Sequence, residues 1–408
     1  MQCGLLGRKL GHSYSPQIHN LLGSYDYRLF EVEPEDLAVF LQKKAYSGLN
    51  VTIPYKKAVI PYCDELSERA EKLCAINTLV CRNGKLIGHN TDYFGFLSMV
   101  QHCGVAVEGK KALVLGSGGA SATAVAVLQE LGAKVTVISR TGPDNYDNLD
   151  RHQDAAMLVN ATPVGMYPDT DSSPVDLSLF PNLECVLDLI YNPANTKLLQ
   201  DAQNRGLAHQ NGLWMLVAQA KESAEWFTGH QIPDSEIDRI YNTIRFNMEN
   251  IILIGMPGCG KSTVGKLLAE MLNRPFIDAD AQLTERAGIS IPEIFETQGE
   301  AGFRKLETQV LSDLGKASGA VIATGGGCVT RAGNYRYLHQ NGRIVWIKRS
   351  IEALAIDGRP LSQAGKLSDM YKARKPLYEA FSDCAVCNDG DPQDAVMQIL
   401  AHLQGGNL

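Results

Sequence analysis

One stretch in the middle of the chain has the residue types and spacing that bind phosphate groups. Residues 255–262 read Gly-Met-Pro-Gly-Cys-Gly-Lys-Ser, which is the pattern G-x-x-x-x-G-K-S. The apolar run 251–254 precedes it and apolar residues at helical spacing follow it, which predicts a buried strand before the loop and a helix after it. Glycines in such a loop let backbone N–H groups surround phosphates, and the helix start adds positive charge. The sequence therefore predicts a nucleotide-binding P-loop.

The side chains of this loop predict a site for ATP and Mg²⁺. Lys261 reaches the outer phosphates, and the Ser262 hydroxyl binds the metal. The strand expected at 320–323 is not followed by the aspartate that P-loop enzymes usually carry there. Asp278, at the end of an earlier strand, is therefore the candidate that helps Ser262 to position the metal. The residues expected to contact ATP are Gly258, Cys259, Gly260, Lys261, Ser262 and Thr263.

A second glycine-rich loop predicts a dinucleotide site. Residues 111–115 and 134–138 are apolar strands, and between them lie the loop 116–121, with the pattern G-x-G-x-x-S, and an apolar helix. This order is typical of a Rossmann βαβ unit. An acid at the end of the second strand would bind the free 2′-hydroxyl of NAD, whereas Arg140 at that place accommodates the 2′-phosphate of NADP. The expected cofactor residues in this unit are Gly116, Gly118, Gly119, Ala120, Ser121, Ser139, Arg140 and Thr141.

Polar side chains follow apolar stretches at several points in the first 95 residues. These groups begin at Ser13, at Thr52, at Asn77 and near residue 90. Ligands bind at the carboxyl ends of strands in an α/β sheet, so the groups predict a small-molecule site. Ser15 before Pro16 is also the pattern of a helix N-cap. Capping is the competing explanation for Ser15, and it does not explain Ser13.

Composition indicates an ordinary globular protein of two or three domains. The 408 residues are 45% hydrophobic and 20% charged. A formal net charge of −7 disfavours nucleic acid or an anionic membrane as the main partner, and no apolar run long enough for a membrane span is present. The N-terminus lacks the pattern of a secretory leader, and the ten scattered cysteines are predicted to be reduced thiols in a cytoplasm. Cys384 and Cys387 are interpreted as part of a core strand and not as a metal site.

Residues 2–246 resemble shikimate dehydrogenase. The resemblance rests on Ser13-x-Ser15-Pro16 and on the segments 50–56, 76–78, 90–92, 116–121, 139–141 and 212–219, which stand in the family's order. It implies that Lys56 and Asp92 form a catalytic pair. The residues that it implies to bind the substrate's hydroxyls and carboxylate are Ser13, Ser15, Thr52, Asn77 and Gln219. Those that it implies to line the cleft are Tyr191 on the substrate side and Gly212 and Met215 on the cofactor side.

These residue types fit the reduction of a ketone by a hydride donor. Lys56 supplies the proton and stabilises the developing alkoxide, while Asp92 orients the lysine and the hydroxyl. Two features depart from the family pattern, because Ser139 replaces the usual asparagine and no second basic residue follows Arg140 within a few positions. NADP remains the expected cofactor, with a preference over NAD that these changes relax.

Residues from about 250 to 400 resemble shikimate kinase. The resemblance rests on the P-loop, on Asp278-x-Asp280 and on the segments 303–307, 325–327, 359–361 and 374–378. The residues that it implies to bind the shikimate carboxylate are Arg304, Arg374, Gly325, Gly326 and Gly327; forked guanidinium groups suit a planar carboxylate. It also implies Asp280 as the contact of the ring hydroxyls and the base, and Arg359 as a lid arginine that neutralises the moving phosphoryl group. Glu307 lies three residues after Arg304 on a helix and can aim it. The lid segment is shorter than in many relatives.

Together the resemblances imply an α/β protein of three domains. A substrate-binding domain spans 1–95 and is completed by helices at 213–246, a Rossmann domain spans 96–212, and a P-loop kinase domain with a parallel sheet spans 248–408. The chain would reduce 3-dehydroshikimate with NADPH and then phosphorylate the shikimate with MgATP. No nucleic acid or membrane partner is expected, and nothing in the sequence indicates an oligomer.

Two other functions stay open at this point. An NAD-dependent quinate/shikimate dehydrogenase fused to a kinase would differ in its cofactor and substrate ratios. A non-catalytic regulator that binds metabolites would be expected to lose Lys56, Asp92, Lys261 or Asp280. All four are present, which counts against the regulator.

Overall fold

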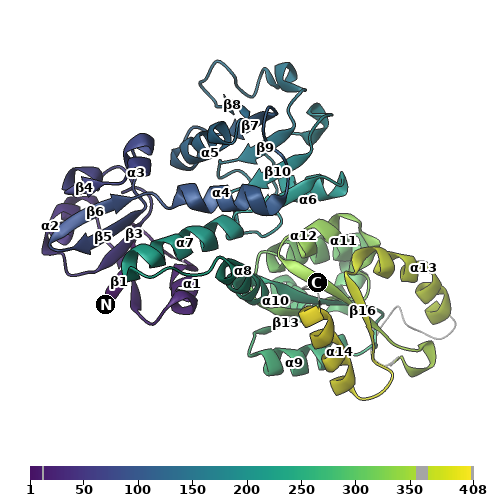
Figure 1. Ribbon diagram of the computed structural model, residues 1–408. Coiled ribbons are helices and arrows are strands. Elements are labelled where there is room, and N and C mark those ends of the chain that lie inside the picture. Colours follow the sequence, from purple (N-terminus) through teal and green to yellow (C-terminus); the bar gives the residue numbers. More distant parts are fainter. Residues whose placement is uncertain (12, 355–365, 406–408) are drawn as a thin grey trace. The chain divides into compact units, whose positions relative to one another are not determined.

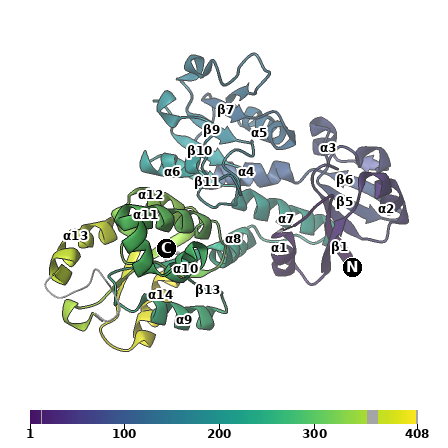
Figure 2. The ribbon, with the colours of Figure 1, turned by 180° about the vertical axis from the view of Figure 1, so that it is seen from behind.

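The described residues form three β-sheets, two in the first part of the chain and one in the second. The structure is a computed structural model that describes residues 1–11, 13–354 and 366–405. Contacts divide the chain into two compact units, Met1–Arg245 and Phe246–Leu408. Both units are of the predicted α/β class, and Figure 1 and Figure 2 show the ribbon from opposite sides.

The first sheet of the first unit is mixed. Its strands lie in the order β2-β1-β3-β5-β6-β4. They are β1 (Gln2–Gly7), β2 (Asp26–Glu31), β3 (Gly48–Val51), β4 (Glu65–Leu66), β5 (Thr78–Arg82) and β6 (Lys85–His89). β1 pairs in parallel with β2 and β3, whereas β5 is antiparallel to β3 and β6. Leu6, Leu49 and Leu79 from neighbouring strands are fully buried in one apolar cluster, and this cluster fixes the sheet that carries the first polar groups.

The second sheet of the first unit is parallel throughout. Its strands lie in the order β11-β10-β9-β7-β8. They are β7 (Lys111–Leu115), β8 (Lys134–Ile138), β9 (Met157–Asn160), β10 (Cys185–Asp188) and β11 (Ala208–Asn211). The helix α5 (Gly119–Glu130) connects β7 to β8, which is the predicted βαβ unit. The strand order reverses between β7 and β9, so the glycine-rich loop after β7 lies where such sheets bind ligands.

Two helices join the sheets of the first unit. α4 (Asp92–Cys103) leads from β6 towards the second sheet, and α7 (Leu213–Thr228) leads back from β11. They pack along each other and lie side by side between the sheets in both views (Figure 1 and Figure 2). A Cβ on Gly95 would lie 2.7 Å from the carbonyl oxygen of Met215, so the glycine permits this close approach.

The second unit is built on one parallel sheet, as predicted. Its strands lie in the order β13-β14-β12-β15-β16. They are β12 (Asn250–Ile254), β13 (Phe276–Asp278), β14 (Val321–Ala323), β15 (Gly342–Lys348) and β16 (Cys384–Cys387). Every residue of the central strand β12 is buried, and the P-loop connects β12 to α9 (Lys261–Leu272). The strand predicted around Cys384 and Cys387 is confirmed, but its place in the core is not, because β16 is an edge strand on which Cys384 is half-buried and Cys387 exposed.

The remaining helices cover these sheets. The α-helices are α1 (Ser15–Leu22), α2 (Leu37–Lys43), α3 (Glu68–Leu73), α6 (Lys197–Asn204), α8 (Ser235–Met248), α10 (Ala279–Ala287), α11 (Ile291–Leu314), α12 (Gly333–His339), α13 (Lys366–Phe381) and α14 (Pro392–Gly405). The short 3₁₀ helices are η1 (Pro34–Asp36), η2 (Ile60–Tyr62), η3 (Leu149–His152), η4 (Leu177–Leu179), η5 (Cys328–Thr330) and η6 (Ile351–Ala353). Among the described helices, none has the length and apolar character needed to cross a membrane.

The competing explanation for Ser15, that it caps a helix, is wrong. α1 begins at Ser15 with Tyr14 at the N-cap, and within the described part of the chain this helix start has no side-chain cap. The Ser15 amide instead donates to Ser13 Oγ at 3.2 Å, and Ser15 is a buried residue that lines a cavity. The helix starts one position earlier than the cap pattern requires, so capping does not account for this serine.

Candidate active sites

A lysine and an aspartate form a pair in a cavity of the first unit. Lys56 Nζ lies 2.5 Å from Asp92 Oδ2, and Asn77 Nδ2 donates to the other carboxylate oxygen, Oδ1, at 2.9 Å. The Asp92 side chain is 13% exposed and the Lys56 side chain 28% exposed. The carboxylate thus holds the ammonium group at a sheltered place that a ligand can still reach.

The ends of three elements position this pair. Lys56 follows β3, Asn77 directly precedes β5, and Asp92 is the first residue of α4. A helix N-terminus carries a positive partial charge and favours a carboxylate there. The Thr91 amide donates to Asn77 Oδ1 at 2.7 Å, which fixes the orientation of the Asn77 amide. Three residues singled out from separate stretches of the sequence are therefore in direct contact.

A buried hydrogen-bond network connects α7 to the pair. Asn77 Nδ2 also lies 3.4 Å from Gln219 Oε1 on α7. One turn further along this helix, Ser223 is fully buried, and its hydroxyl contacts three more polar side chains within 2.9 Å. These are Asn50, Thr78 and Thr91. Sequence reasoning missed Ser223, although its i,i+4 spacing from Gln219 on an expected helix is a signal that could have found it.

The same cavity contains the other residues expected to bind the substrate or to line the cleft. They are Ser13, Ser15, Thr52, Ala120, Tyr191, Gly212 and Met215. The Tyr191 ring meets the Tyr14 ring edge to face, with centroids 6.2 Å apart, and burial raises the pKa of Tyr191. A Cβ on Gly212 would lie 2.1 Å from the Leu189 carbonyl oxygen, so only glycine fits there. Residues that follow strands of both sheets therefore meet in one cavity.

The glycine-rich loop after β7 is open on one side and closely packed on the other. Gly116 has a φ of +104°, and a Cβ there would lie 3.1 Å from the Ala161 carbonyl oxygen. Around Gly118 and Gly119, no described atom lies within 4 Å of an added Cβ, so a phosphate has room at the start of α5. Ser121 is buried, and its hydroxyl donates to the Gly116 carbonyl at 2.6 Å. Its side chain shapes the loop from within.

The end of β8 presents a guanidinium group to solvent. Arg140 and Thr141 are exposed, while Ser139 is half-buried. The Ser139 amide donates to the Asp144 carbonyl at 3.2 Å, which closes a turn directly after the strand. The three residues expected to bind the cofactor at this strand end are therefore next to β7 and its loop, as the pairing of β7 with β8 requires.

A cavity of the second unit contains the P-loop. Lys261, Ser262 and Thr263 begin α9 and line this cavity with Gly258 and Gly260. Lys261 is buried, and its Nζ donates to two carbonyl oxygens of the loop at 3.0 Å each. Cys259 was expected to contact ATP. Its side chain is fully buried and is not among the cavity-lining groups of the described residues, so its backbone alone is left for that contact.

The predicted metal residues lie together. Ser262 Oγ lies 2.7 Å from Asp278 Oδ2. The other oxygen of Asp278 accepts hydrogen bonds from the amides of Asp280 and Ala281 and so caps α10. The cap fixes the carboxylate of Asp278. Its Oδ2 atom and the Ser262 hydroxyl oxygen are thus two adjacent atoms that can bind a metal at the start of α9.

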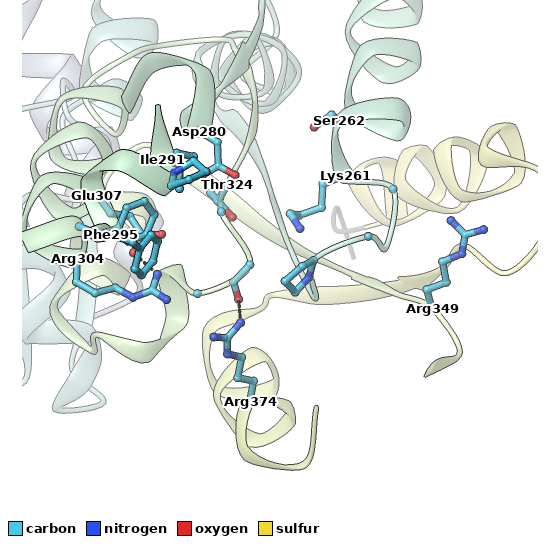
Figure 3. A pocket seen from close by; sticks show the side chains of 18 of the residues that line it. Lys261, Ser262, Asp280, Ile291, Phe295, Arg304, Glu307, Thr324, Arg349 and Arg374 are labelled. Atoms are coloured by element: carbon cyan, nitrogen blue, oxygen red, sulfur yellow. Dashed lines mark hydrogen bonds and ion pairs between the residues drawn. The ribbon is translucent and has the colours of Figure 1, made fainter. Parts of the chain in front are cut away.

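Charged side chains gather at the other end of this cavity (Figure 3). Arg304 and Glu307 are buried on α11, and Arg304 Nη1 donates to Glu307 Oε2 at 2.8 Å. Burial raises the pKa of Glu307, and Arg304 opposes this. A Cβ on Gly325 would lie 2.7 Å from Asp280 Oδ1, and one on Gly327 would collide with the Arg304 guanidinium. The glycine run therefore lies directly against these three side chains.

The glycine run is held by α13. Arg374 Nη1 donates to the Gly326 carbonyl oxygen at 3.1 Å, and the Tyr378 hydroxyl donates to the same oxygen at 2.5 Å. The expected lid residue, Arg359, lies outside the described residues.

Sequence reasoning missed part of the wall of this cavity. The additional residues are Pro257, Ile291, Pro292, Phe295, Phe303, Thr324 and Arg349. Phe295 and Phe303 stack with centroids 4.6 Å apart, although eight residues span about 12 Å along a straight helix. The kink of α11 at Gly299, where φ is +67°, allows the contact. Spacing along the sequence gives no signal for it, because only the kink brings the two rings together.

Comparison with known proteins identifies both units. Residues 5–79 match the family model of the shikimate dehydrogenase substrate binding domain, and residues 257–404 match that of shikimate kinase. The NADP(+) shikimate dehydrogenase of Clostridium perfringens is 35% identical over 264 residues, which cover 59% of this chain and 97% of that protein. The chain belongs to the shikimate dehydrogenase family. A shikimate kinase domain follows in the same chain.

Solved structures of shikimate dehydrogenases resemble the dehydrogenase unit. Shikimate dehydrogenase 1 of Peptoclostridium difficile is 39% identical, with a TM-score of 0.55, and the match covers 60% of this chain and 97% of that one. The shikimate 5-dehydrogenase of Thermus thermophilus, solved with NADP(H) and shikimate, is 32% identical, with a TM-score of 0.55, over 60% of this chain and 99% of that one. The fold predicted for the first unit is thereby confirmed.

Proposed function

We propose that the chain catalyses two consecutive reactions of the shikimate pathway. The dehydrogenase unit reduces 3-dehydroshikimate to shikimate with NADPH, and the kinase unit phosphorylates shikimate with MgATP to shikimate 3-phosphate. One observation carries the proposal. Each unit gathers the charged groups for its reaction in a single cavity, Lys56 with Asp92 in the first, and Lys261 with Asp280 and Arg304 in the second.

The residues present fit NADP. Gly118 and Gly119 leave room for a phosphate at the N-terminus of α5, and Arg140 places an exposed cation at the end of β8. These groups would hold the pyrophosphate and the 2′-phosphate. Met215 and Ala120 line the cavity that contains Lys56, which gives the cofactor a place next to the substrate.

Lys56 is the proton donor of the proposed reduction, in which NADPH supplies the hydride. Held by Asp92, Lys56 Nζ gives a proton to the ketone oxygen and offsets its developing negative charge. The hydrogen bond from Asn77 to the second carboxylate oxygen keeps Asp92 in place. The residues that we propose to bind the remaining polar groups of the substrate are Ser13, Ser15, Thr52, Asn77, Tyr191 and Gln219.

The kinase unit binds shikimate through its carboxylate in this proposal. Arg304, aimed by Glu307, and Arg374, next to the glycine run, present forked donors that match a carboxylate. Asp280 contacts the ring hydroxyls and takes the proton of the attacking one. Lys261 neutralises charge on the phosphates of ATP. This matters because enzymes catalyse phosphoryl transfer mainly by positioning the reactants and by electrostatic stabilisation.

The kinase residues also fit Mg²⁺. Ser262 Oγ and Asp278 Oδ2 are adjacent oxygen donors, and Mg²⁺ is commonly bound by one or two carboxylates together with substrate phosphates. These two residues would hold the metal at the start of α9, where it neutralises phosphate charge.

One protein preparation tests both activities. NADPH oxidation is followed with 3-dehydroshikimate, and ADP release is followed with shikimate and MgATP. We expect Lys56→Ala to lower dehydrogenase turnover by about 10²-fold or more, as for a lost general acid, and to leave the kinase unchanged. Lys261→Ala and Asp280→Asn should remove kinase activity and leave NADPH oxidation unchanged. Normal turnover by Lys56→Ala, or a kinase that survives both other changes, would contradict the assigned roles.

The same assays separate the rival functions. A higher kcat/KM for quinate with NAD than for shikimate with NADP would favour the quinate/shikimate dehydrogenase, and binding without turnover would favour a regulator. We further propose a cytoplasmic location, small-molecule partners only, and the three domains 1–95 with 213–246, 96–212 and 248–408. All ten cysteines are free thiols, which is the state that proteins keep in a reducing compartment.

A further inference from the structure

Arg349 is a charged residue of the kinase cavity that the mechanism above does not use. It directly follows β15, the strand next to the P-loop strand β12, and the pairing register sets Ile254 opposite Trp346. The two parallel strands end at the same edge of the sheet. The residues that follow them are therefore neighbours, and Arg349 lines the cavity together with the P-loop.

The guanidinium of Arg349 lies beside the backbone of the P-loop. A Cβ on Gly260 would lie 3.9 Å from Arg349 Nη1. In the view of Figure 3, Lys261 lies between Arg349 on one side and Asp280 and Arg304 on the other. Arg349 is thus at the end of the cavity away from the groups proposed to bind shikimate.

The loop on this side is held by the end of β16. Asn388, directly after β16, donates a hydrogen bond from its side-chain nitrogen Nδ2 to the Cys259 carbonyl oxygen at 2.8 Å. A Cβ on Gly260 would lie 2.3 Å from the same nitrogen. The P-loop backbone near Arg349 is therefore held in place.

Among the described residues, none accepts a hydrogen bond from the buried nitrogen of this arginine, Nε. Asp389 is a nearby acid, but its carboxylate accepts a hydrogen bond from the Ser350 amide at 2.6 Å. That bond lowers the pKa of Asp389 more than Arg349 does. A buried donor without an acceptor is unfavourable, so a ligand that brings an acceptor to Nε would gain free energy.

We propose that Arg349 binds the phosphate chain of the nucleotide, near the end that carries the nucleoside. A guanidinium presents forked N–H donors that match phosphate oxygens. Stacking on the base would use the face of the guanidinium and leave Nε without an acceptor, which favours the phosphate. Since ATP and ADP share this end of the chain, Arg349 contributes to the binding of both. The proposal rests on the kinase function proposed above.

Calorimetric titration of the full-length protein with MgADP tests the proposal without turnover. The variants are Arg349→Gln, which removes the charge, and Arg349→Lys, which keeps the charge and loses the fork. Lys348→Gln is the matched control, because Lys348 is the adjacent cation, lies over the Trp346 ring and is not a cavity-lining residue of the described chain. We expect Arg349→Gln to raise the Kd of MgADP by about 10-fold or more, as for a lost charge-assisted hydrogen bond, and Arg349→Lys to recover part of the loss. Lys348→Gln should bind like the wild type.

Kinetics and salt dependence complete the test. Arg349→Gln should raise the KM for ATP by a similar factor and leave the KM for shikimate unchanged, whereas damage to the fold would raise both. Weaker dependence of the MgADP Kd on KCl in Arg349→Gln is expected if a phosphate contact is lost, and an unchanged dependence would overturn the phosphate assignment. Equal MgADP binding by wild type and Arg349→Gln would overturn the inference alone. A wild-type protein that binds no MgADP would instead overturn the proposed kinase function.

Discussion

At the scale of single residues, both cavities hold a cation against a carboxylate. Lys56 is held by Asp92, and Arg304 is held by Glu307. In each case the carboxylate comes from the start or the side of a helix, so the backbone fixes its position. A cation that is already oriented loses less freedom when a substrate binds. Both pairs line cavities and are sheltered from solvent, unlike surface ion pairs, whose net contribution is small. This supports our proposal that they belong to the binding sites.

We predict that Arg140 sets the preference for NADPH over NADH. Arg140→Ala should lower the ratio of kcat/KM for NADPH to that for NADH by about 10-fold or more, because a charge-assisted contact to the 2′-phosphate is lost. Arg151→Ala is the control, since Arg151 is another exposed arginine of the same sheet region. A wild-type enzyme without a preference for NADPH, or a ratio that Arg140→Ala leaves unchanged, would show that Arg140 does not read the 2′-phosphate.

We predict that a side chain at Gly327 weakens shikimate binding by the kinase. An alanine Cβ there would collide with both terminal nitrogens of Arg304, and the flexible guanidinium would move away from Glu307. Gly327→Ala should raise the KM for shikimate by about 10-fold, while the KM for ATP stays within about twofold. The control is Gly333→Ala, because no described atom lies within 4 Å of a Cβ at Gly333. Equal increases in both KM values would contradict a specific effect on Arg304.

At the scale of elements, α7 serves both the cavity and the core of the dehydrogenase unit. Its N-terminal half brings Met215 and Gln219 to the cavity. The next turn places Ser223 in the buried network with Asn50 and Thr91. Close packing of α7 along α4 at Gly95 fixes the spacing of the two helices. Changes in the buried part of α7 should therefore affect the stability of the unit and the placement of Gln219 together.

We predict that Glu222 on α7 makes the stability of the dehydrogenase unit depend on pH. Burial raises the pKa of Glu222 to about 7, although Arg69 opposes this, and the Glu222 side chain is 17% exposed. The pKa of Glu222 is higher in the folded protein than in the unfolded chain, so between about pH 4.5 and 7 the carboxyl group is protonated in the folded protein and ionised in the unfolded chain. The free energy of unfolding of the wild type therefore falls as the pH rises through this window. Glu222→Gln is neutral throughout. Its free energy of unfolding should equal that of the wild type near pH 4.5 and exceed it at pH 8, by at most about 3 kcal/mol.

Urea unfolding followed by tryptophan fluorescence at pH 5, 6, 7 and 8 measures this effect. Both proteins carry Trp346→Phe, so that the remaining tryptophans, Trp214 and Trp226, belong to the dehydrogenase unit. Glu68→Gln, the loss of an exposed carboxylate in α3, controls for the change in net charge. A difference between wild type and Glu222→Gln that is the same at every pH would refute the assignment to this carboxyl group.

At the scale of the whole molecule, the boundary between the units lies inside one helix. α8 runs from Ser235 to Met248, and the boundary falls between Arg245 and Phe246. Phe246 packs against the kinase core, with the Arg274 guanidinium 4.5 Å from its ring. Arg274 also donates to the carbonyls of Phe246 and Glu249. A separate kinase should therefore begin at Phe246, two residues before Met248, the start that the sequence had suggested.

Separation of the chain at this boundary makes the last prediction. Residues 1–245 and 246–408, made separately, should keep their two activities, since each unit contains its own cavity and core. The matched comparison is a kinase that begins at Met248. It should have the same kcat and a Tm lower by a few degrees, about the effect of 1 kcal/mol lost with the Phe246 contacts. A folded half that is active only when the other half is added would show that the sites depend on each other.

The sequence by itself determined the fold class, the two glycine-rich loops and most of the residues in both cavities. These features depend on local patterns, in which strand, loop and helix are read from neighbouring residues, and on motifs whose order resembles two families. Lys56, Asn77 and Asp92 come from three such motifs. The resemblance implied the pairing of Lys56 with Asp92, but not the contact of Asn77 with Asp92. The ends of β3, β5 and α4 bring the three residues together.

Only the tertiary structure decided which side chains share a space across distant segments. Ser223 reaches Asn50 because α7 returns to the first sheet, Phe295 reaches Phe303 because α11 bends at Gly299, and Arg349 reaches the P-loop because β15 lies beside β12. The first and third contacts join segments far apart in the sequence, and the second depends on a bend that the spacing of the two rings does not reveal. The physical reason is that strand pairing, helix packing and the bend of α11, and not local propensity, set these distances.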